Sequence, residues 1–476
     1  MTNKFRFGVL ALMLSLFYST GLKAEVKLPA FFSNGMVLQQ QTKASVWGTA
    51  GAGRKMTITT SWDNKKATLT VDASGKWKTT ITTPKAGGPY SITFNDGRQT
   101  VLQDVLIGEV WLCSGQSNME MPMKGFKNQP VDGANMDILK SANSQIRLFT
   151  VGHSSTIDTQ NDVKGNWESA TPVSVRDFSA TAYYYGRLLQ QVLNVPVGLI
   201  CSSWGGSCVE AWMDEDMLKA FPEVKLPKTP EDIKEKNRTP TTLYKGMIAP
   251  LAGYSMRGVI WYQGESNYDR YTSYASMFST MIQSWRAKWN QGDFPFYYCQ
   301  IAPYDYAIIT AAGKDVINSA YLREAQSAVE KKVENVGMAV LVDAGLEKGI
   351  HPVKKQIAGE RLALQALVKT YKMEGVTADG PFYKEMAVQG DTVVLSFDRT
   401  QMWVAVPKGD FRNFKVAGAD KKFYPARAWV VRSKVYVKSD EVKKPVAVRY
   451  AFDNYVEGDL YGTEGLPVSS FRTDNW

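Results

Sequence analysis

The pattern of hydrophobic and polar positions differs between three stretches of the chain. Over residues 25–104, short segments of alternating apolar and polar residues are separated by turn residues such as Asp63-Asn64 and Ser74-Gly75. Strands at this spacing are typical of a small β-sandwich. The same texture returns near the C-terminus. We therefore expect one β-sandwich-like domain over residues 25–104 and a second, C-terminal β domain over residues 374–476.

The middle of the chain, residues 105–373, has a different pattern. Apolar strand-like runs alternate with amphipathic stretches of helical period. Because nearly continuous apolar strands need cover on both faces, this pattern predicts an α/β domain with a parallel sheet sandwiched by helices. The runs are 107–113, 195–202, 257–262, 295–301 and 336–343, and the helical stretches are 180–193, 271–289, 318–334 and 352–371.

The N-terminus indicates export. Lys4 and Arg6 precede the mostly apolar run 7–17, and Ala24 supplies a small residue for cleavage. We therefore predict a signal peptide over residues 1–24 and a periplasmic or secreted mature protein. The run is shorter than the roughly 20 apolar residues of a spanning helix, and no later stretch approaches that length, so no membrane span is expected.

The charge pattern and the cysteines argue against nucleic-acid binding and against a metal site. The formal net charge is +10, but basic and acidic residues are interleaved without a basic run, which argues against a nucleic-acid partner. The four cysteines show no CxxC spacing and have no histidine nearby, so we expect no metal. No organic cofactor is expected either, because the acyl transfer argued from the residues below needs none. Cys201 and Cys208 have the option of a disulfide in an exported protein, but the apolar runs around the cysteines favour buried free thiols.

Residues with catalytic chemistry follow the ends of the predicted strands. In an open parallel sheet, ligands bind beyond the carboxyl ends of the strands. A hydroxyl, backbone donors, a side-chain amide and an imidazole are the groups that nucleophilic acyl transfer requires. These ends carry Ser117 after the first strand, Gly205-Gly206 after the second, Gln263 after the third and His351 shortly after the fifth.

The chain has two histidines, His153 and His351, so there are two candidates for an imidazole base. His153 lies in a polar stretch with no strand end beside it. We therefore predict His351 as the general base and Ser117 as the nucleophile. The structural alternatives are a serine that caps a helix or lies in a loop, and a histidine that caps a helix.

Three motifs resemble the sialate O-acetylesterase family of SGNH-type hydrolases. They are GEVWLCSGQSNME at 108–120, GVIWYQGESN at 258–267 and IHP at 350–352. The similarity extends over nearly the whole mature chain. It implies an SGNH-hydrolase-like, flavodoxin-like parallel sheet between helices, and a carbohydrate esterase whose substrate is an O-acetylated sugar.

The resemblance also implies roles for the site residues. Ser117 is the nucleophile and His351 the base. The backbone N–H groups of Ser117 and Gly206, with the side-chain amide of Gln263, form the oxyanion hole. Gly205 is an alternative to Gly206, and Gln263 is alternatively a structural amide that ties strand ends together.

The third member of the triad departs from the pattern of SGNH hydrolases. They usually have aspartate three residues before the histidine, but here that residue is Lys348. Asp343 and Glu347 are the nearest acids, and a backbone carbonyl in place of either leaves a Ser-His dyad. Glu265 is expected to orient the site, to bind sugar hydroxyls or to be a buried structural acid.

The substrate expectation rests on the resemblance. An O-acetylated sialic acid comes first, and acetyl xylan or another acetylated glycan is the alternative within the same chemistry. A noncatalytic glycan-binding protein is the alternative from a different class. The presence of both Ser117 and His351 argues against that alternative.

Overall fold

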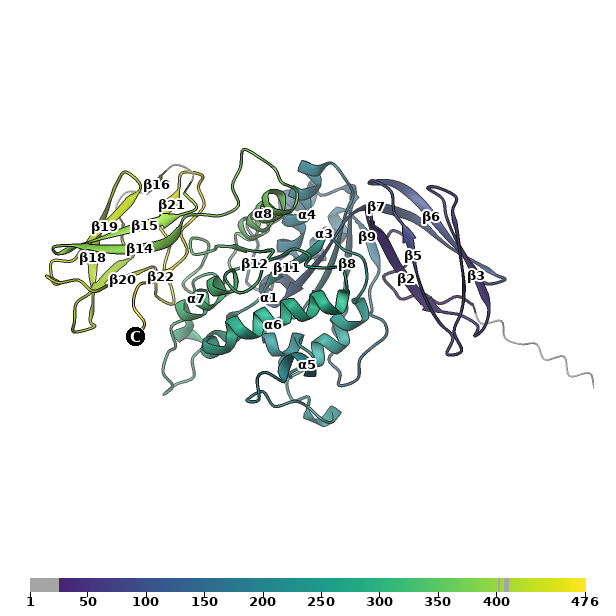
Figure 1. The fold of residues 1–476 in the computed structure, drawn as a ribbon, viewed down its shortest axis with the longest axis horizontal. Helices are drawn as coiled ribbons and strands as arrows, with labels where there is room; N and C mark the ends of the chain where they lie inside the picture. Colours follow the sequence, from purple (N-terminus) through teal and green to yellow (C-terminus); the bar gives the residue numbers. More distant parts are fainter. Residues whose placement is uncertain (1–24, 401–402, 406–410) are drawn as a thin grey trace, which may run out of the picture.

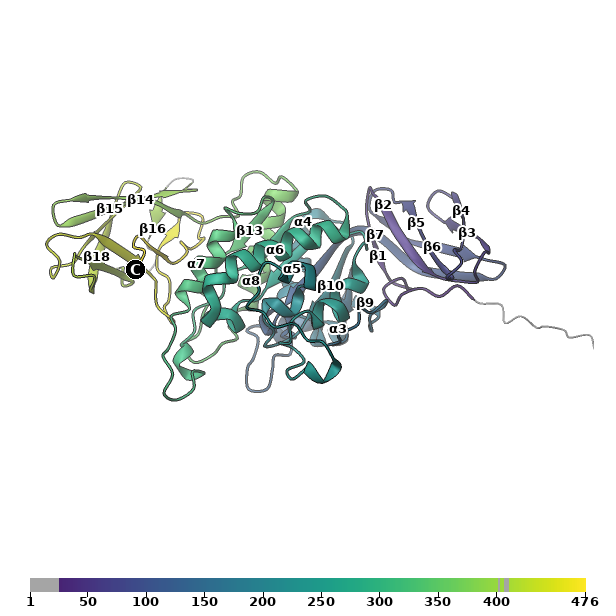
Figure 2. The same cartoon turned by 60° about the horizontal axis from the view of Figure 1, so that its bottom comes forward.

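The computed structural model describes residues 25–400, 403–405 and 411–476. The predicted signal peptide, residues 1–24, lies outside the described residues. Figure 1 shows a central α/β body between a β-rich N-terminal part and a β-rich C-terminal part. Figure 2 shows the same three parts in a row from a second direction.

A mixed sheet forms the centre of the molecule. Six of its strands are parallel to their neighbours, and the seventh is an antiparallel edge strand. The predicted apolar runs all contain strands of this sheet, which confirms an α/β fold. The order is β13 (Val336–Ala339), β12 (Phe296–Cys299), β11 (Gly258–Tyr262), β7 (Gln99–Gly115), β10 (Val197–Ser203), β8 (Asn143–Thr150) and β9 (Trp167–Ala170).

Strand β8 is the parallel strand that the apolar pattern does not predict. Gln145 and Arg147 interrupt its apolar run. The guanidinium of Arg147 binds Asp104 at 2.6 Å between Nη1 and Oδ2. Because this ion pair neutralises a buried arginine, a charged residue can lie within this strand of the central sheet.

Helices cover both faces of the central sheet. Along β11, Ile260 and Tyr262 join the core that contains α4 and α8, whereas Val259 and Trp261 join the core that contains α6 and α7. This alternation places one pair of helices on each face. The long helices are α4 (Ala180–Leu193), α6 (Tyr271–Trp289), α7 (Ala320–Val329) and α8 (Lys355–Gln365), and the short ones are α1 (Ser117–Glu120), α2 (Ala134–Leu139), α3 (Pro172–Asp177) and α5 (Glu215–Leu218).

Two of the four predicted helices, 180–193 and 271–289, have the expected bounds. The predicted helix 318–334 is shortened to α7. The predicted helix 352–371 begins at Lys355, and its last turn is the π-helix η7 (Ala366–Thr370). The late start leaves His351 in the loop before the helix, where its ring is free to turn toward the sheet.

Strand β7 connects the N-terminal strands to the central sheet. Its 17 residues pair first with β6 (Gly87–Asn95) and then with β10 and β11. It therefore runs through residues 104 and 105, where the texture of the sequence changes. The other N-terminal strands are β1 (Val37–Gln39), β2 (Lys43–Thr49), β3 (Lys55–Thr60), β4 (Lys66–Thr70) and β5 (Lys76–Thr82).

The C-terminal part is an antiparallel sheet with its own hydrophobic core. Val393, Leu395, Val435 and Val437 point into this core. A separate pair, β16 (Val404–Ala405) and β21 (Tyr461–Gly462), lies beside it. The sheet order is β14 (Phe382–Gln389), β15 (Thr392–Asp398), β19 (Lys434–Lys438), β18 (Phe423–Val431), β17 (Phe414–Ala417), β20 (Ala447–Tyr450) and β22 (Phe471–Arg472).

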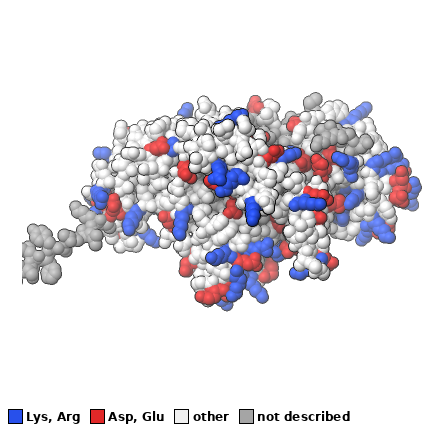
Figure 3. Space-filling model, turned by 180° about the vertical axis from the view of Figure 1, so that it is seen from behind, with Lys and Arg blue, Asp and Glu red and all other residues white. Residues whose placement is uncertain are grey.

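The described residues also bear on the cysteine and charge expectations. All four cysteines are buried and free, which confirms the prediction of buried thiols. On the face seen in Figure 3, basic and acidic side chains are interspersed. Within the described ranges, no helix is long and apolar enough to cross a membrane.

Candidate active site

Ser117 stands just beyond the end of the central strand β7. The chain turns at Gly115, which has a φ of +137°, and a Cβ there would lie 2.1 Å from the carbonyl oxygen of Tyr262. Only glycine fits this position. Helix α1 begins directly afterwards at Ser117. Because β10 and β11 flank β7, the loops after all three strands approach the same point.

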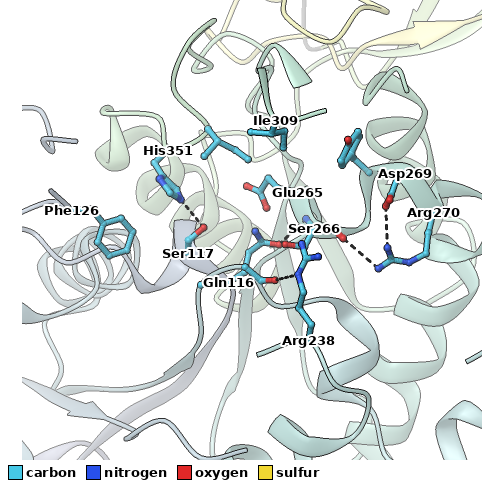
Figure 4. Close-up of a pocket in the computed structure, with 14 residues that line it drawn as sticks. Gln116, Ser117, Phe126, Arg238, Glu265, Ser266, Asp269, Arg270, Ile309 and His351 are labelled. Atoms are coloured by element: carbon cyan, nitrogen blue, oxygen red, sulfur yellow. Dashed lines mark hydrogen bonds and ion pairs between the residues drawn. The ribbon is translucent and has the colours of Figure 1, made fainter. Parts of the chain in front are cut away.

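Ser117 and His351 are in direct contact. The Nε2 atom of His351 lies 2.7 Å from Oγ of Ser117, as Figure 4 shows. The other ring nitrogen, Nδ1, faces Oε1 of Gln129. An amide oxygen only accepts, so we assign the ring proton to Nδ1, which leaves the Nε2 lone pair for the serine hydroxyl. The structure thus brings together the predicted nucleophile and base.

The acceptor behind His351 is an amide rather than an acid. Asp343 binds Arg361 through both carboxylate oxygens, at 2.6 and 2.7 Å. Among the described residues, His351 hydrogen-bonds only to Ser117 and Gln129, so Glu347 does not reach the ring either. Of the alternatives that the sequence leaves open, neither candidate acid, Asp343 or Glu347, orients the imidazole in this structure, and Ser117 and His351 form a dyad. A bidentate pair with arginine is strong enough to hold Asp343 in place.

Ser117 and Gly206 each bring a backbone N–H group to the lining of the cavity. Gly206 has a φ of +71° and lines the same cavity as Ser117. Within the described part of the chain, the N–H groups of Ser117 and Gly206 have no acceptor. The N–H of Gly205 is taken by Oε2 of Glu120 at 2.5 Å. The geometry therefore favours Gly206 over Gly205 as an oxyanion donor.

Gln263 is turned away from the cavity. Its fully buried side chain donates from Nε2 to the carbonyl of Ser207 at 3.1 Å and to Oδ1 of Asn267 at 2.7 Å. Its Oε1 accepts from the hydroxyl of Tyr274 at 2.9 Å. Since both amide hydrogens are used in these bonds, the predicted oxyanion role of the Gln263 side chain is wrong in this structure. Its structural alternative is the one observed.

A different amide lines the cavity beside the serine. Oε1 of Gln116 accepts from the N–H groups of Gly264 at 3.2 Å and Ser266 at 3.3 Å. Its NH2 group has no acceptor among the described residues, and the side chain borders the cavity. Gln116 is thus an available donor that the sequence analysis missed. Its place immediately before Ser117 is the signal that points to it.

A buried chain of polar groups lies behind Ser117 and His351. Nδ2 of Asn118 donates to Oε1 of Glu265 at 2.5 Å and to the carbonyl of Ile350 at 3.1 Å, and its Oδ1 accepts from Lys355. Burial lowers the pKa of Lys355 to about 7 and raises the pKa of Glu265. Burial, with the charge of Lys355 nearby, lowers the pKa of His351 to about 4. The imidazole is thus kept neutral, as a general base must be.

An open cavity of about 590 Å³ is lined by Gln116, Ser117, Gly206, Glu265 and His351. That volume lies in the range of small-molecule sites. Arg238, Asp269 and Arg270 line its outer part. Arg270 is paired with Asp269 at 3.1 Å, so the rim carries mixed charge with Arg238 as a further cation.

The family of the chain follows from residues 107–367. They match the model of a carbohydrate esterase family described as sialic acid-specific acetylesterase. The match covers more than half of the chain and includes both Ser117 and His351. The chain belongs to this family. The carbohydrate esterase is therefore a carboxylic ester hydrolase that acts on acetylated sugars, and the noncatalytic alternative is not retained.

Relatives of this carbohydrate esterase extend the match beyond the central domain. Sialate O-acetylesterase from Rattus norvegicus is 28% identical and covers 86% of this chain and 85% of the relative. The enzyme of the same name from Mus musculus is 27% identical and covers 94% of both chains. A solved carbohydrate acetylesterase from Xanthomonas citri is 35% identical, with a TM-score of 0.86, and covers 95% of this chain and 100% of that structure.

The other histidine, His153, forms a cluster with Glu120 and Trp204 beside the esterase site. Nε2 of His153 lies 2.7 Å from Oε1 of Glu120, and its ring stacks on Trp204 with 4.1 Å between ring centroids. Because Glu120 also accepts from Gly205, this cluster supports the turn that presents Gly206. The expectation that no strand end lies beside His153 is wrong, because β8, which the apolar pattern does not predict, ends at Thr150.

Proposed function

We propose that this carbohydrate esterase is exported and removes O-acetyl groups from sialic acid through an acetyl-serine intermediate. The proposal depends above all on one observation, the 2.7 Å contact between Nε2 of His351 and Oγ of Ser117 at an open cavity. Export rests on the sequence pattern of residues 1–24.

In acylation, the acetyl group moves from the sugar oxygen to Oγ of Ser117, and the serine proton moves to the sugar oxygen through His351. Oγ of Ser117 attacks the acetyl carbonyl carbon while Nε2 of His351 accepts the hydroxyl proton. The N–H groups of Ser117 and Gly206, with the NH2 group of Gln116, donate to the developing oxyanion. When the tetrahedral intermediate collapses, the bond to the sugar oxygen breaks and His351 returns the proton to that oxygen.

Deacylation repeats the same proton transfers with water. His351 accepts a proton from the attacking water, and the second tetrahedral intermediate expels Ser117, which regains the proton as acetate forms. In both steps the imidazole becomes positively charged for a moment. The amide oxygen of Gln129 accepts from Nδ1–H, so it orients the ring and stabilises this charge through its dipole.

The charge at the cavity supports a sialic acid over a neutral sugar. Arg238 lines the cavity, and its acidic partner Glu235 lies at 3.7 Å in an exposed, loose pair. A substrate carboxylate near Arg238 gains a charge-assisted hydrogen bond that a xylose residue lacks. The names of the mammalian relatives point to the same substrate class.

Acetate release from two substrates tests this choice. We expect kcat/KM for O-acetylated N-acetylneuraminic acid to exceed that for acetylated xylan by at least about tenfold, because a charge-assisted bond contributes ~1.5–3 kcal/mol. Arg238→Gln is expected to reduce this preference. Because Nε of Arg238 also donates to the carbonyl of Gly206 at 3.0 Å, the variant's hydrolysis of an aryl acetate is measured alongside, and the preference is compared as a ratio of the two sugar substrates. A preference of the wild-type enzyme for xylan would replace sialic acid by a plant glycan as the substrate.

The pH profile tests the state of the base. His351 accepts a proton only when neutral, and its pKa of about 4 lies below the ordinary value of 6.5. Activity should therefore fall as the pH drops through about 4, rather than through 6.5, when kcat/KM for an aryl acetate is measured. In Lys355→Met the nearby positive charge is removed, so the acid limb should move to higher pH. An acid limb near 6.5 in the wild type would contradict the burial of a neutral imidazole.

A further inference from the structure

The carboxyl group of Glu265 is fixed in the cavity with one oxygen unused. Glu265 opens the helix η5 (Glu265–Arg270) directly after β11, and its residue exposure is 3%. Oε1 accepts from Asn118 at 2.5 Å. Oε2 is buried and has no hydrogen-bond partner among the described residues. Glu265 nevertheless lines the cavity, and Figure 4 shows its carboxyl group directed into it, on the side of Ser117 and His351.

An unpartnered buried acceptor has a cost that a ligand can remove. Leaving such a group unsatisfied destabilises a protein by ~1–3 kcal/mol, and by more when it is charged. The reaction described above uses Ser117, His351 and the oxyanion donors but gives Glu265 no task. The unpartnered oxygen of Glu265 needs an explanation, and its position at the cavity makes Glu265 a candidate for binding a ligand rather than a purely structural residue.

The anchor of Glu265 fixes its position relative to the reacting atoms. Both hydrogens of the Asn118 amide are used, one on Glu265 and one on the carbonyl of Ile350. Asn118 follows Ser117 in the chain, and Ile350 precedes His351. The amide thus ties the carboxyl to chain segments that adjoin both residues, which fixes the carboxyl relative to Ser117 and His351.

Lys355 keeps this anchor in one orientation. It donates to Oδ1 of Asn118, which directs the NH2 group of that amide toward Glu265. Lys355 is 1% exposed, and its charge partly offsets the rise in the pKa of the Glu265 carboxyl that burial causes. The lysine thereby supports an acceptor at Oε2.

We propose that Oε2 of Glu265 accepts a hydrogen bond from a free hydroxyl on the carbon next to the acetylated carbon of the sugar. This inference rests on the proposed function and deepens it, because it assigns the substrate class: sugar acetates with a free neighbouring hydroxyl. The hydroxyl supplies the partner that Oε2 lacks. It also places the ester carbonyl toward the N–H groups of Ser117 and Gly206.

Matched substrates give the direct test. One substrate is O-acetylated N-acetylneuraminic acid. Its counterpart has a hydrogen in place of the hydroxyl on the sugar carbon adjacent to the acetylated carbon. A second pair of the same design is built on acetylated methyl xyloside. We expect the wild-type enzyme to hydrolyse the hydroxyl-bearing member of at least one pair with kcat/KM about tenfold to a hundredfold higher, the effect of losing one hydrogen bond to a charged group. Equal rates in both pairs would overturn the inference without any variant.

Glu265→Gln separates a binding role from a structural one. Glutamine keeps an oxygen for Asn118 but replaces the charged acceptor by an NH2 group, so the preference for the hydroxyl-bearing substrate should fall by about tenfold. A purely structural Glu265 would instead lower the activity on both members equally and leave their ratio unchanged. Glu109→Gln is the matched control, because Glu109 is also a fully buried carboxyl, paired with Arg257 at the other end of the sheet. Its ratio should equal that of the wild type.

The same assays distinguish failure of the inference from failure of the proposed function. An aryl acetate has no sugar hydroxyl, so its hydrolysis reports on Ser117, His351 and the oxyanion donors without the proposed contact to Glu265. If Ser117→Ala removes that activity but the hydroxyl pairs show no preference, only the role of Glu265 is wrong. If Ser117→Ala hydrolyses the aryl acetate as fast as the wild type, the proposed function itself is wrong.

Discussion

Replacement of Ser117 by alanine is expected to lower kcat for an aryl acetate by at least about ten-thousand-fold, the scale seen when a nucleophilic serine is lost. The hydroxyl that lies 2.7 Å from Nε2 of His351 forms the covalent bond to the acetyl group. No other hydroxyl is in contact with that imidazole among the described residues. The backbone N–H of residue 117 remains in the variant, so the residual rate reflects the oxyanion donors alone.

Ser266→Ala is the matched control for this prediction. Ser266 lines the same cavity, but its hydroxyl makes no contact with His351. Its removal should change kcat by a few-fold at most. Mass spectrometry after rapid mixing with the aryl acetate should detect an acetylated wild-type protein and an unmodified Ser117→Ala. Retention of more than a small fraction of activity in Ser117→Ala would assign the nucleophile to another residue.

The parallel sheet and the position of Ser117 and His351 are predictable from the sequence. Continuous apolar strands with amphipathic helices between them leave few alternatives to a parallel sheet covered on both faces. The carboxyl ends of such strands meet at one edge, which is why two residues far apart in the chain meet there. A strand such as β8 escapes this reasoning, because the ion pair of Arg147 with Asp104 is visible only in three dimensions.

The direction of side chains at the strand ends is harder to predict. Gln263 follows β11 as expected, but its amide is surrounded by Ser207, Asn267 and Tyr274, which satisfy all of its hydrogen-bonding groups. A sequence places a residue at an edge, but the partners that turn its side chain inward come from other loops. Gln116 faces the cavity instead, because Gly264 and Ser266 hold its oxygen and leave its NH2 group free.

The residue that orients the imidazole of His351 also could not be predicted, because it comes from a remote part of the chain. Sequence distance favours Asp343 and Glu347, which lie within a few residues of the histidine. Arg361 on α8 binds Asp343, and the loop before α2 brings Gln129 to the imidazole from a remote part of the chain. A neutral amide at this position stabilises the protonated ring less than a carboxylate does. This difference agrees with the low pKa of His351, which a carboxylate partner would raise.

Replacement of His351 by alanine is expected to lower kcat for the aryl acetate by about ten-thousand-fold, because Ser117 then has no base to accept its proton. Asn118 and Lys355 do not contact the hydroxyl and cannot take over this role. The removed ring leaves space beside Ser117 at the open cavity, so added imidazole should restore part of the activity. A structural role of His351 would not produce such rescue.

His153→Ala is the matched control for the base, since His153 is the second of the two histidines in the chain. It lies in the same region but contacts Glu120 and Trp204 rather than Ser117. Its loss weakens the support of the Gly205–Gly206 turn and should cost about tenfold or less in kcat, with no rescue by imidazole. If the two variants lost activity equally, or if imidazole rescued only His153→Ala, the proton of Ser117 would have to pass to a group other than His351.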